Sequence, residues 1–391
     1  MTSMQDDLFG DALPLPPANA LSETASRAKP KPNGAAKVLP APAAQECSAL
    51  ARQLPAHLRF GVSTWSYPGW EGLVWDGEYD SSTLSKHGLA AYHQHPLLRT
   101  VCVDRTFWRP LSASQYAVYA KQVDDDFRFV VKCPAIVTDA LVRGEDEGRT
   151  REPNPAFLDP ALAIQEFVRP ALDGLGAKLG VLVFQLSPLP LGWLSRPAAL
   201  LERLGRMLAA VREALSAHDA VIVAVEVRDP ELLGQALVDT LKAHGATFCL
   251  GLHGKMPPID AQLPMLRALW PGPLVCRWNL NREFGAYGYP DAQKKHDPFD
   301  EIRTPDAHTR AILAKTIDGI TSRGLPAFVT VSNDAEGCAP RSIALLAEAV
   351  PVRVEAVTSI MTALSGEQRT RLTRLCRRLV KALAPEEDEQ S

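Results

Sequence analysis

Eight short apolar segments, separated by longer amphipathic ones, dominate the chain from residue 58 to residue 350. They are rich in β-branched residues and show little polar alternation, which is typical of parallel strands covered on both faces. The segments expected to form strands are residues 59–64, 100–104, 128–132, 181–185, 221–227, 247–250, 274–278 and 327–331. Alternation of such strands with helices predicts parallel strand–helix–strand units, and eight units predict a TIM-like (β/α)8 barrel of mostly parallel strands.

The amphipathic segments repeat their apolar residues at helical spacing, as in the stripe of Leu200, Leu201, Leu204, Met207, Leu208 and Val211. The helices expected between the strands are residues 82–93, 112–123, 159–175, 196–217, 231–244, 259–269, 304–323 and 340–349. An open doubly wound sheet is the alternative architecture. It is disfavoured because no glycine-rich phosphate-binding turn follows the first strand.

Two flanking regions differ from the barrel. Residues 1–55 are rich in proline and alanine, and we expect a disordered tail there, with one helical turn near its end. Residues 351–391 are expected to add helices at 356–364 and 367–383 and an acidic end. The second helix carries a basic face opposite its leucines, which favours a packing helix with a solvated side; binding of nucleic acid or a partner is the alternative. The barrel itself is assigned to residues 56–350.

Composition narrows the class of protein. Hydrophobic residues make up 46% and charged residues 22%, and the formal net charge is −3, so the chain has no general attraction for nucleic acid, although local patches leave such binding open. The seven cysteines are isolated, which argues against a disulfide framework or a structural zinc site. No secretory signal or apolar run long enough for a bilayer is present. The sequence therefore predicts a cytoplasmic protein without membrane association.

The ends of the predicted strands carry the candidate site, because the loops of a (β/α)8 barrel converge at the carboxyl ends of its strands. The candidate catalytic residues there are Glu226, Lys132 and Asp104. Polar and aromatic side chains at the same strand ends are candidates for binding a substrate: Trp65, Tyr67, Phe107, Gln185, Arg228, Arg277, Asn279, Asn333 and Asp334.

Glu226 and Arg228 form the strongest pair among these candidates. They are separated by one residue in a strand, so their side chains point to the same side while the flanking valines point to the other. The pair is either an ion pair that ties the barrel together, or an acid/base carboxylate with an arginine that orients it or binds an anion.

Lys132 and the carboxylates allow further interpretations. The lysine is expected to form a salt bridge, to anchor a phosphate or carboxylate, or to act as a Schiff-base nucleophile. Asp104, Glu226, His253 and Asp334 are the set that a hard metal ion would need. They come from four strands without a metal-binding spacing, so neither a metal nor another cofactor is predicted.

Six sequence blocks at these strand ends resemble the domain-of-unknown-function family seventy-two, the YecE-like proteins. They are FGVSTWSYPGW (60–70), TVCVDRTFW (100–108), DFRFVVKCP (126–134), LGVLVFQLSP (179–188), VAVEVRDP (223–230) and SNDAEGCAP (332–340). The resemblance covers about residues 58–350 and implies a TIM-like barrel, but no established reaction.

The chain departs from the family pattern at three strands. Cys102-Val103-Asp104 stands where the family usually has Glu-Val-Asn, and Arg277-Trp278-Asn279-Leu280 where it usually has Arg-x-His-Gly. In the last strand, Ser332 replaces the first asparagine of Asn-Asn-Asp. A carboxylate and an imidazole are thus missing from the mouth, which puts catalysis by this member in doubt.

The N-terminal tail contains a separate motif. Gln5, Leu8 and Phe9 resemble the short Q-x-x-L-F peptide by which bacterial replication and repair proteins bind the sliding clamp. In such a peptide the apolar pair enters a groove and the glutamine forms hydrogen bonds at its rim. A chance acidic sequence is the alternative.

These features predict a barrel that binds or processes a small polar or anionic ligand at its mouth, with Glu226 as acid/base. Whether it is an enzyme is left open. One alternative is a non-catalytic or DNA-maintenance accessory protein tethered to the sliding clamp through the tail. The other is a barrel that assembles through its C-terminal helices.

Overall fold

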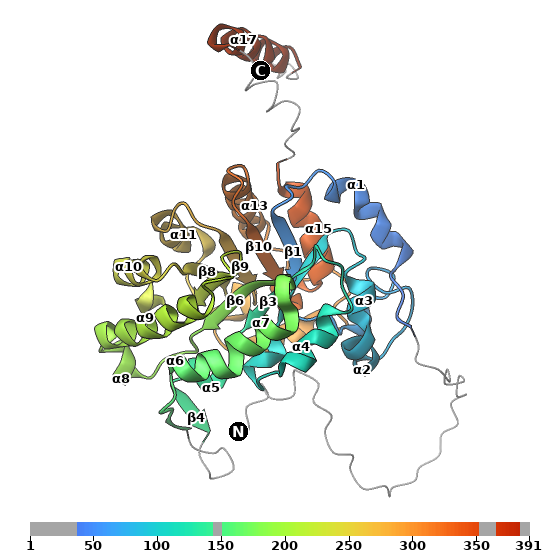
Figure 1. Ribbon diagram of the computed structural model, residues 1–391. Coiled ribbons are helices and arrows are strands. Elements are labelled where there is room, and N and C mark those ends of the chain that lie inside the picture. The colour runs from blue at the N-terminus through green and yellow to red at the C-terminus, as the bar shows by residue number, and fades with distance from the viewer. Residues whose placement is uncertain (1–36, 144–150, 352–364, 384–391) are drawn as a thin grey trace, which may run out of the picture.

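The computed structural model describes residues 37–143, 151–351 and 365–383. Eight parallel strands close into a barrel surrounded by helices, which confirms the predicted fold (Figure 1). In order around the barrel, the strands are β1 (Leu58–Val62), β10 (Ala327–Val331), β9 (Leu274–Trp278), β8 (Thr247–Leu252), β7 (Ile222–Glu226), β6 (Leu179–Gln185), β3 (Arg128–Lys132) and β2 (Leu98–Val103).

Each strand is followed by helical structure on the outside of the barrel. In chain order these outer helices are α2 (Ser81–Thr83) and α3 (Leu89–Tyr92), α4 (Ala113–Ala120), α6 (Pro160–Ala163) and α7 (Arg169–Leu175), α9 (Pro197–Ala214), α10 (Gln235–Ala243), α11 (Ile259–Ala268), α13 (Ala307–Thr321) and α15 (Ala339–Ala349). The predicted stripe on α9 lies on its inner face: Leu201 is half-buried, and the other members are fully buried, namely Leu200, Leu204, Met207, Leu208 and Val211.

The barrel interior and the layer outside it form separate hydrophobic clusters. Inside the barrel lie Cys102, Val130, Val181, Val183, Ala224, Cys249, Val275 and Phe328. The much larger cluster fills the space between strands and outer helices. Both faces of every strand are therefore covered, which explains why the strands read as continuous apolar runs.

The segment before the first strand differs from the prediction. Residues 37–55 were expected to belong to a disordered tail, but Val38, Ala41 and Ala44 are buried against the barrel. Pro40 forms a β-bridge with Trp75, and the chain continues through α1 (Ser48–Ala51). Three small apolar side chains and this backbone pairing stabilise the segment despite its proline content, so the expectation of disorder was wrong for residues 37–46. The helical turn expected near the end of the tail is α1. Residues 1–36 lie outside the described residues.

Several elements in the connections were not predicted. The loop after β3 contains α5 (Ala135–Thr138) and a hairpin of β4 (Leu141–Arg143) and β5 (Arg151–Pro153). Short helices α8 (Leu191–Leu194) and α14 (Asn333–Glu336) follow β6 and β10, and α12 (Tyr289–His296) lies between β9 and α13. These elements lie in loops that follow strand ends, where their side chains can reach the barrel mouth.

The C-terminal region contains α17 (Gly366–Leu383), as predicted. The helix expected at 356–364 lies outside the described residues. None of the helices in the described part of the chain has both the length and the apolar character needed to cross a bilayer.

Candidate functional site

The barrel mouth is a polar layer directly above the apolar interior. Side chains two positions apart in a strand share a face. Residues that follow Cys102, Val130, Val183, Ala224 and Val275 of the interior cluster by two positions therefore also point inward, one layer closer to the carboxyl ends. These residues are Asp104, Lys132, Gln185, Glu226 and Arg277. In each of these strands the next inward-facing residue after the apolar layer is polar, and in four of the five it is charged.

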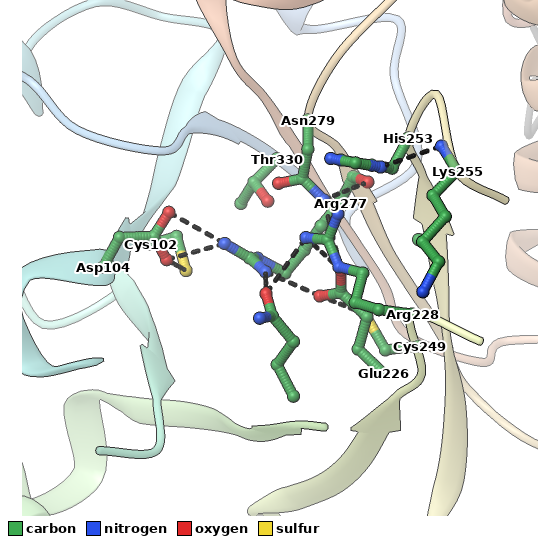
Figure 2. A network of polar contacts seen from close by, with 12 residues as sticks. Cys102, Asp104, Glu226, Arg228, Cys249, His253, Lys255, Arg277, Asn279 and Thr330 are labelled. Carbon is green, nitrogen blue, oxygen red and sulfur yellow. Dashed lines mark hydrogen bonds and ion pairs between the residues drawn. The ribbon is translucent and has the colours of Figure 1, made fainter. Parts of the chain in front are cut away.

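Arg277 is the centre of a network that joins four strands (Figure 2). Its Nη1 donates to Glu226 Oε2 at 2.6 Å and to Gln185 Oε1 at 3.2 Å. Its Nη2 donates to both carboxylate oxygens of Asp104, at 2.7 and 2.8 Å. Because both terminal nitrogens contact carboxylates, Arg277 links the strand ends of the mouth, although its buried Nε has no partner among the described residues.

Glu226 is fully buried between two arginines. Oε1 lies 2.7 Å from Arg228 Nη2, and Asn279 Nδ2 donates to the same oxygen at 3.3 Å. Burial alone would raise the pKa of Glu226, but the charges of Arg228 and Arg277 lower it to about 2. A carboxylate that stays ionised and fully hydrogen-bonded is poorly suited to proton transfer near neutral pH. The geometry therefore favours the ion-pair interpretation of Glu226 over the predicted acid/base role.

Lys132 is a buried amine with an unusual environment. Its Nζ lies 3.6 Å from the centre of the Phe107 ring, a cation–π contact. Among the described residues, it has no carboxylate within salt-bridge distance. Burial lowers the pKa of Lys132 to about 8, and the nearby charge of Asp104 opposes this shift. The amine is thus mostly protonated at neutral pH without a hydrogen-bond acceptor from the described chain.

Arg228 has unused donors as well. Its Nη2 contacts Glu226 and donates to Gln185 Oε1 at 3.0 Å. Its Nε is buried and has no hydrogen-bond partner in the described structure. With three cations and two carboxylates in the layer (Lys132, Arg228, Arg277, Asp104 and Glu226), one positive charge is uncompensated when Lys132 is protonated.

Asp334 lies in α14, directly after β10, and its carboxyl has no ion-pair partner in the described structure. Oδ2 accepts a hydrogen bond from Ser332 Oγ at 3.2 Å, whereas the buried Oδ1 has no partner among the described residues. Burial raises the pKa of Asp334 to about 7, with the Ser332 hydrogen bond opposing the shift. A buried carboxyl that titrates near neutral pH is a common feature of acid/base sites.

Tyr289 and His253 belong to the site but were not among the predicted binding residues. Their rings lie 5.5 Å apart. Burial raises the pKa of Tyr289 to about 12, and Arg228, Asp334 and other mouth charges also act on it. Burial and then Arg228 lower the pKa of His253 to about 3, so its imidazole is neutral. Tyr289 enters from α12, a helix that the sequence analysis did not predict; the proline after it, at the first turn, was the available signal.

The remaining predicted binding residues occupy different positions. Tyr67 packs against Trp70 and Phe299, and burial and then Asp334 raise the pKa of its hydroxyl. Asn333 Oδ1 accepts from the Trp70 indole and from a backbone N–H, while its buried Nδ2 has no partner in the described structure. Trp65 lies in the hydrophobic core and donates its indole N–H to a backbone carbonyl, so it offers no polar atom to a ligand. Gln5, Leu8 and Phe9 lie outside the described residues.

The alternative of a hard metal site finds no support in the geometry. Among the described residues, no group of three or more His, Cys, Asp and Glu side chains is arranged to hold a metal ion. Asp104 and Glu226, which that site would have used, are instead bound to Arg277.

Fold and site together define a (β/α)8-barrel protein with a charged mouth. A family model described as "Protein of unknown function DUF72" matches residues 59–368. The chain therefore belongs to the DUF72 family, as the sequence blocks predicted.

Several solved structures are similar to the chain. A DUF72 family protein from Enterococcus faecalis aligns with a TM-score of 0.49 and 15% identity, over 75% of this chain and 94% of that chain. One from Thermotoga maritima gives a TM-score of 0.46 and 17% identity, over 74% and 97%. A D-tagatose 3-epimerase-like protein gives 0.45 and 15%, over 76% and 99%. Comparison with curated proteins finds no significant match.

Proposed function

We propose that this barrel binds a small anionic ligand at its mouth through Lys132 and Arg228. The observation that carries the proposal is a pair of buried cations: the Nε of Arg228 has no hydrogen-bond partner in the described structure, and the Nζ of Lys132 is in cation–π contact with Phe107 without an ion pair in the described part of the chain. A buried cationic donor without an acceptor is costly, and an anionic oxygen would satisfy it with a strong, charge-assisted hydrogen bond. Arg277, Glu226 and Asp104 serve as the support that fixes Arg228 and the strand ends.

Asp334 is the proposed proton-transfer group, in place of Glu226. Its free Oδ1 and its pKa of about 7 allow it both to donate and to accept a proton at neutral pH. With an anion held by Lys132 and Arg228, the supported reaction class is proton transfer on a small ligand that carries a carboxylate or phosphate. Tyr67 and Tyr289 are the proposed walls of the ligand site, because, in addition to burial, the charge of Asp334 raises the pKa of both hydroxyls.

Binding of sulfate tests the anion site, because the charge of sulfate stays constant above pH 6. We expect Lys132→Met to weaken sulfate binding ~10- to 100-fold, the value of one hydrogen bond to a charged group. Binding is measured as the shift in Tm with sulfate concentration, beside the exposed control Lys121→Met. In the wild type, affinity should fall as the pH rises through about 8, the pKa of Lys132, and the Met variant should lack this dependence. Equal affinity of the wild type and Lys132→Met would refute the proposal.

A second function rests on the Q-x-x-L-F motif of Gln5, Leu8 and Phe9. We propose that these residues tether the protein to a sliding clamp, where the barrel acts as an accessory to DNA maintenance. The support is the position of the motif at the far end of a long proline- and alanine-rich segment, from which a partner could reach it.

A further inference from the structure

An apolar groove lies on the outside of the barrel, between α11 and α13. These helices are neighbours in the outer layer (Figure 1). The groove has a volume of about 460 Å³, and Leu263, Leu266, Trp270 and Ile312 contribute apolar surface to it. This volume is within the range of ligand-binding pockets. Trp270 is 38% exposed, so a large aromatic side chain remains available to a binding partner.

The rim of this groove is basic. Arg267, Lys315 and Arg323 all line it and are exposed, and no aspartate or glutamate is among its described lining residues. Arg323 lies over the Trp270 ring, 4.8 Å from its centre, which places a cation directly beside the apolar floor. A matching occupant therefore combines apolar side chains with carboxylates.

We infer that this groove binds residues 6–13 of the same chain. That segment reads DDLFGDAL, in which Asp6, Asp7 and Asp11 alternate with the apolar residues Leu8, Phe9 and Leu13. Its carboxylates match the basic rim and its apolar side chains match the floor. Helix α17 is a poor occupant because its many arginines would be repelled, and the acidic end at residues 386–389 has no apolar side chain.

The linker is long enough for this contact. Residues 14–36 separate the segment from Lys37, where the described structure begins. Extended, these 23 residues span roughly 75–80 Å. A domain of this size has a radius of gyration of about 19 Å, so the segment can reach any face. Covalent attachment also raises its effective concentration to about the millimolar range, which lets a weak contact form. The inference is independent of the anion site.

Photo-cross-linking in the full-length chain tests the contact. A benzophenone amino acid in place of Phe9 is expected to cross-link to α11 and α13, as mapped by mass spectrometry. The double variant Lys315→Glu with Arg323→Glu should reduce the yield at least fivefold. Arg206→Glu, which reverses another exposed charge, on α9, is the control and should leave the yield unchanged. Adding Asp6→Lys with Asp7→Lys to the rim variant should restore it.

Two outcomes would overturn the inference. One is cross-linking to other surfaces, or a yield at the groove that does not respond to reversal of the rim charges. The other is cross-linking between isotopically labelled and unlabelled chains in a mixture, which would assign the groove to a second copy.

Discussion

Lys132 and Asp334 differ from the other charged residues of the mouth because neither is paired with an opposite charge in the described structure. Their pKa values move toward neutrality for the same reason, since burial disfavours the charged form of each group. Glu226 is buried more completely, but its pKa is lowered, away from neutrality, because two arginines contact it. In this mouth, the charged partners of a carboxyl determine whether it can exchange protons near neutral pH more than its degree of burial does.

Replacement of Asp334 by asparagine should stabilise the protein at neutral pH. The pKa of Asp334 is about 7 in the folded state, above its unfolded value, so the unfolded state loses its proton first as the pH rises. The wild type therefore loses stability relative to Asp334→Asn between about pH 4 and pH 7. Between pH 5 and pH 8 the difference in unfolding free energy should change by about 2–3 kcal/mol, as measured by urea denaturation. A difference that is constant with pH would contradict the raised pKa.

At the residue scale, the side on which a strand residue points was easier to predict from the sequence than its partners. Period-two alternation correctly placed Glu226 and Arg228 on the same side of β7 and its extension. It could not show that Arg277, from a distant part of the chain, would neutralise Glu226, because such pairing depends on barrel register. The burial of Trp65 in the core could not be predicted either, since an aromatic residue at a strand end has the same sequence pattern in the core as in a binding site.

At the element scale, adjacent strands cooperate to hold the mouth. β9 supplies Arg277, β7 supplies Glu226, and β8 between them has Gly251 in register with Arg277. A Cβ at Gly251 would lie 3.0 Å from Glu226 Cγ and Oε1, so any larger residue would crowd the carboxylate. The glycine leaves the space through which the two charged side chains meet.

The ion pairs between these strands should be strongly coupled. Arg277→Met leaves the fully buried Glu226 with Arg228 alone and removes the ion pair of Asp104, and we expect it to lower the unfolding free energy by ~3–5 kcal/mol. The double variant Arg277→Met with Glu226→Gln should lose much less unfolding free energy than the two single variants lose together, because each substitution removes the same interaction. Urea denaturation of the four proteins in this cycle measures the coupling. Strictly additive losses would show that the pair contributes nothing as a pair.

The strands were predictable as elements because their interior and exterior faces are both apolar, a pattern that the sequence preserves in all eight. The loop elements were not. The β4–β5 hairpin has only three residues in each strand, and α12 has strongly polar residues on most positions, so neither has enough apolar periodicity to be recognised. Tyr289 was missed for this reason.

On the scale of the whole molecule, the proposed groove contact and the proposed clamp contact would compete for the same side chains. Leu8 and Phe9 are the apolar pair in both the clamp proposal and the groove proposal. If the groove binds residues 6–13, it hides the pair from a clamp until the contact opens. This competition could not be predicted from the sequence, because the groove forms only when α11 and α13 pack together.

Recovery of the full-length chain on immobilised sliding clamp tests the tether. Leu8→Ala with Phe9→Ala should reduce recovery by about tenfold or more, since two buried apolar side chains each contribute ~1.5–3 kcal/mol. Arg206→Glu should leave recovery unchanged, whereas Lys315→Glu with Arg323→Glu should increase it, because the rim no longer attracts Asp6 and Asp7 and the tail is released. Equal recovery of the wild type and the Leu8/Phe9 variant would remove the tether. If recovery falls in that variant but does not rise when the rim charges are reversed, the tether is supported and its competition with the groove is refuted.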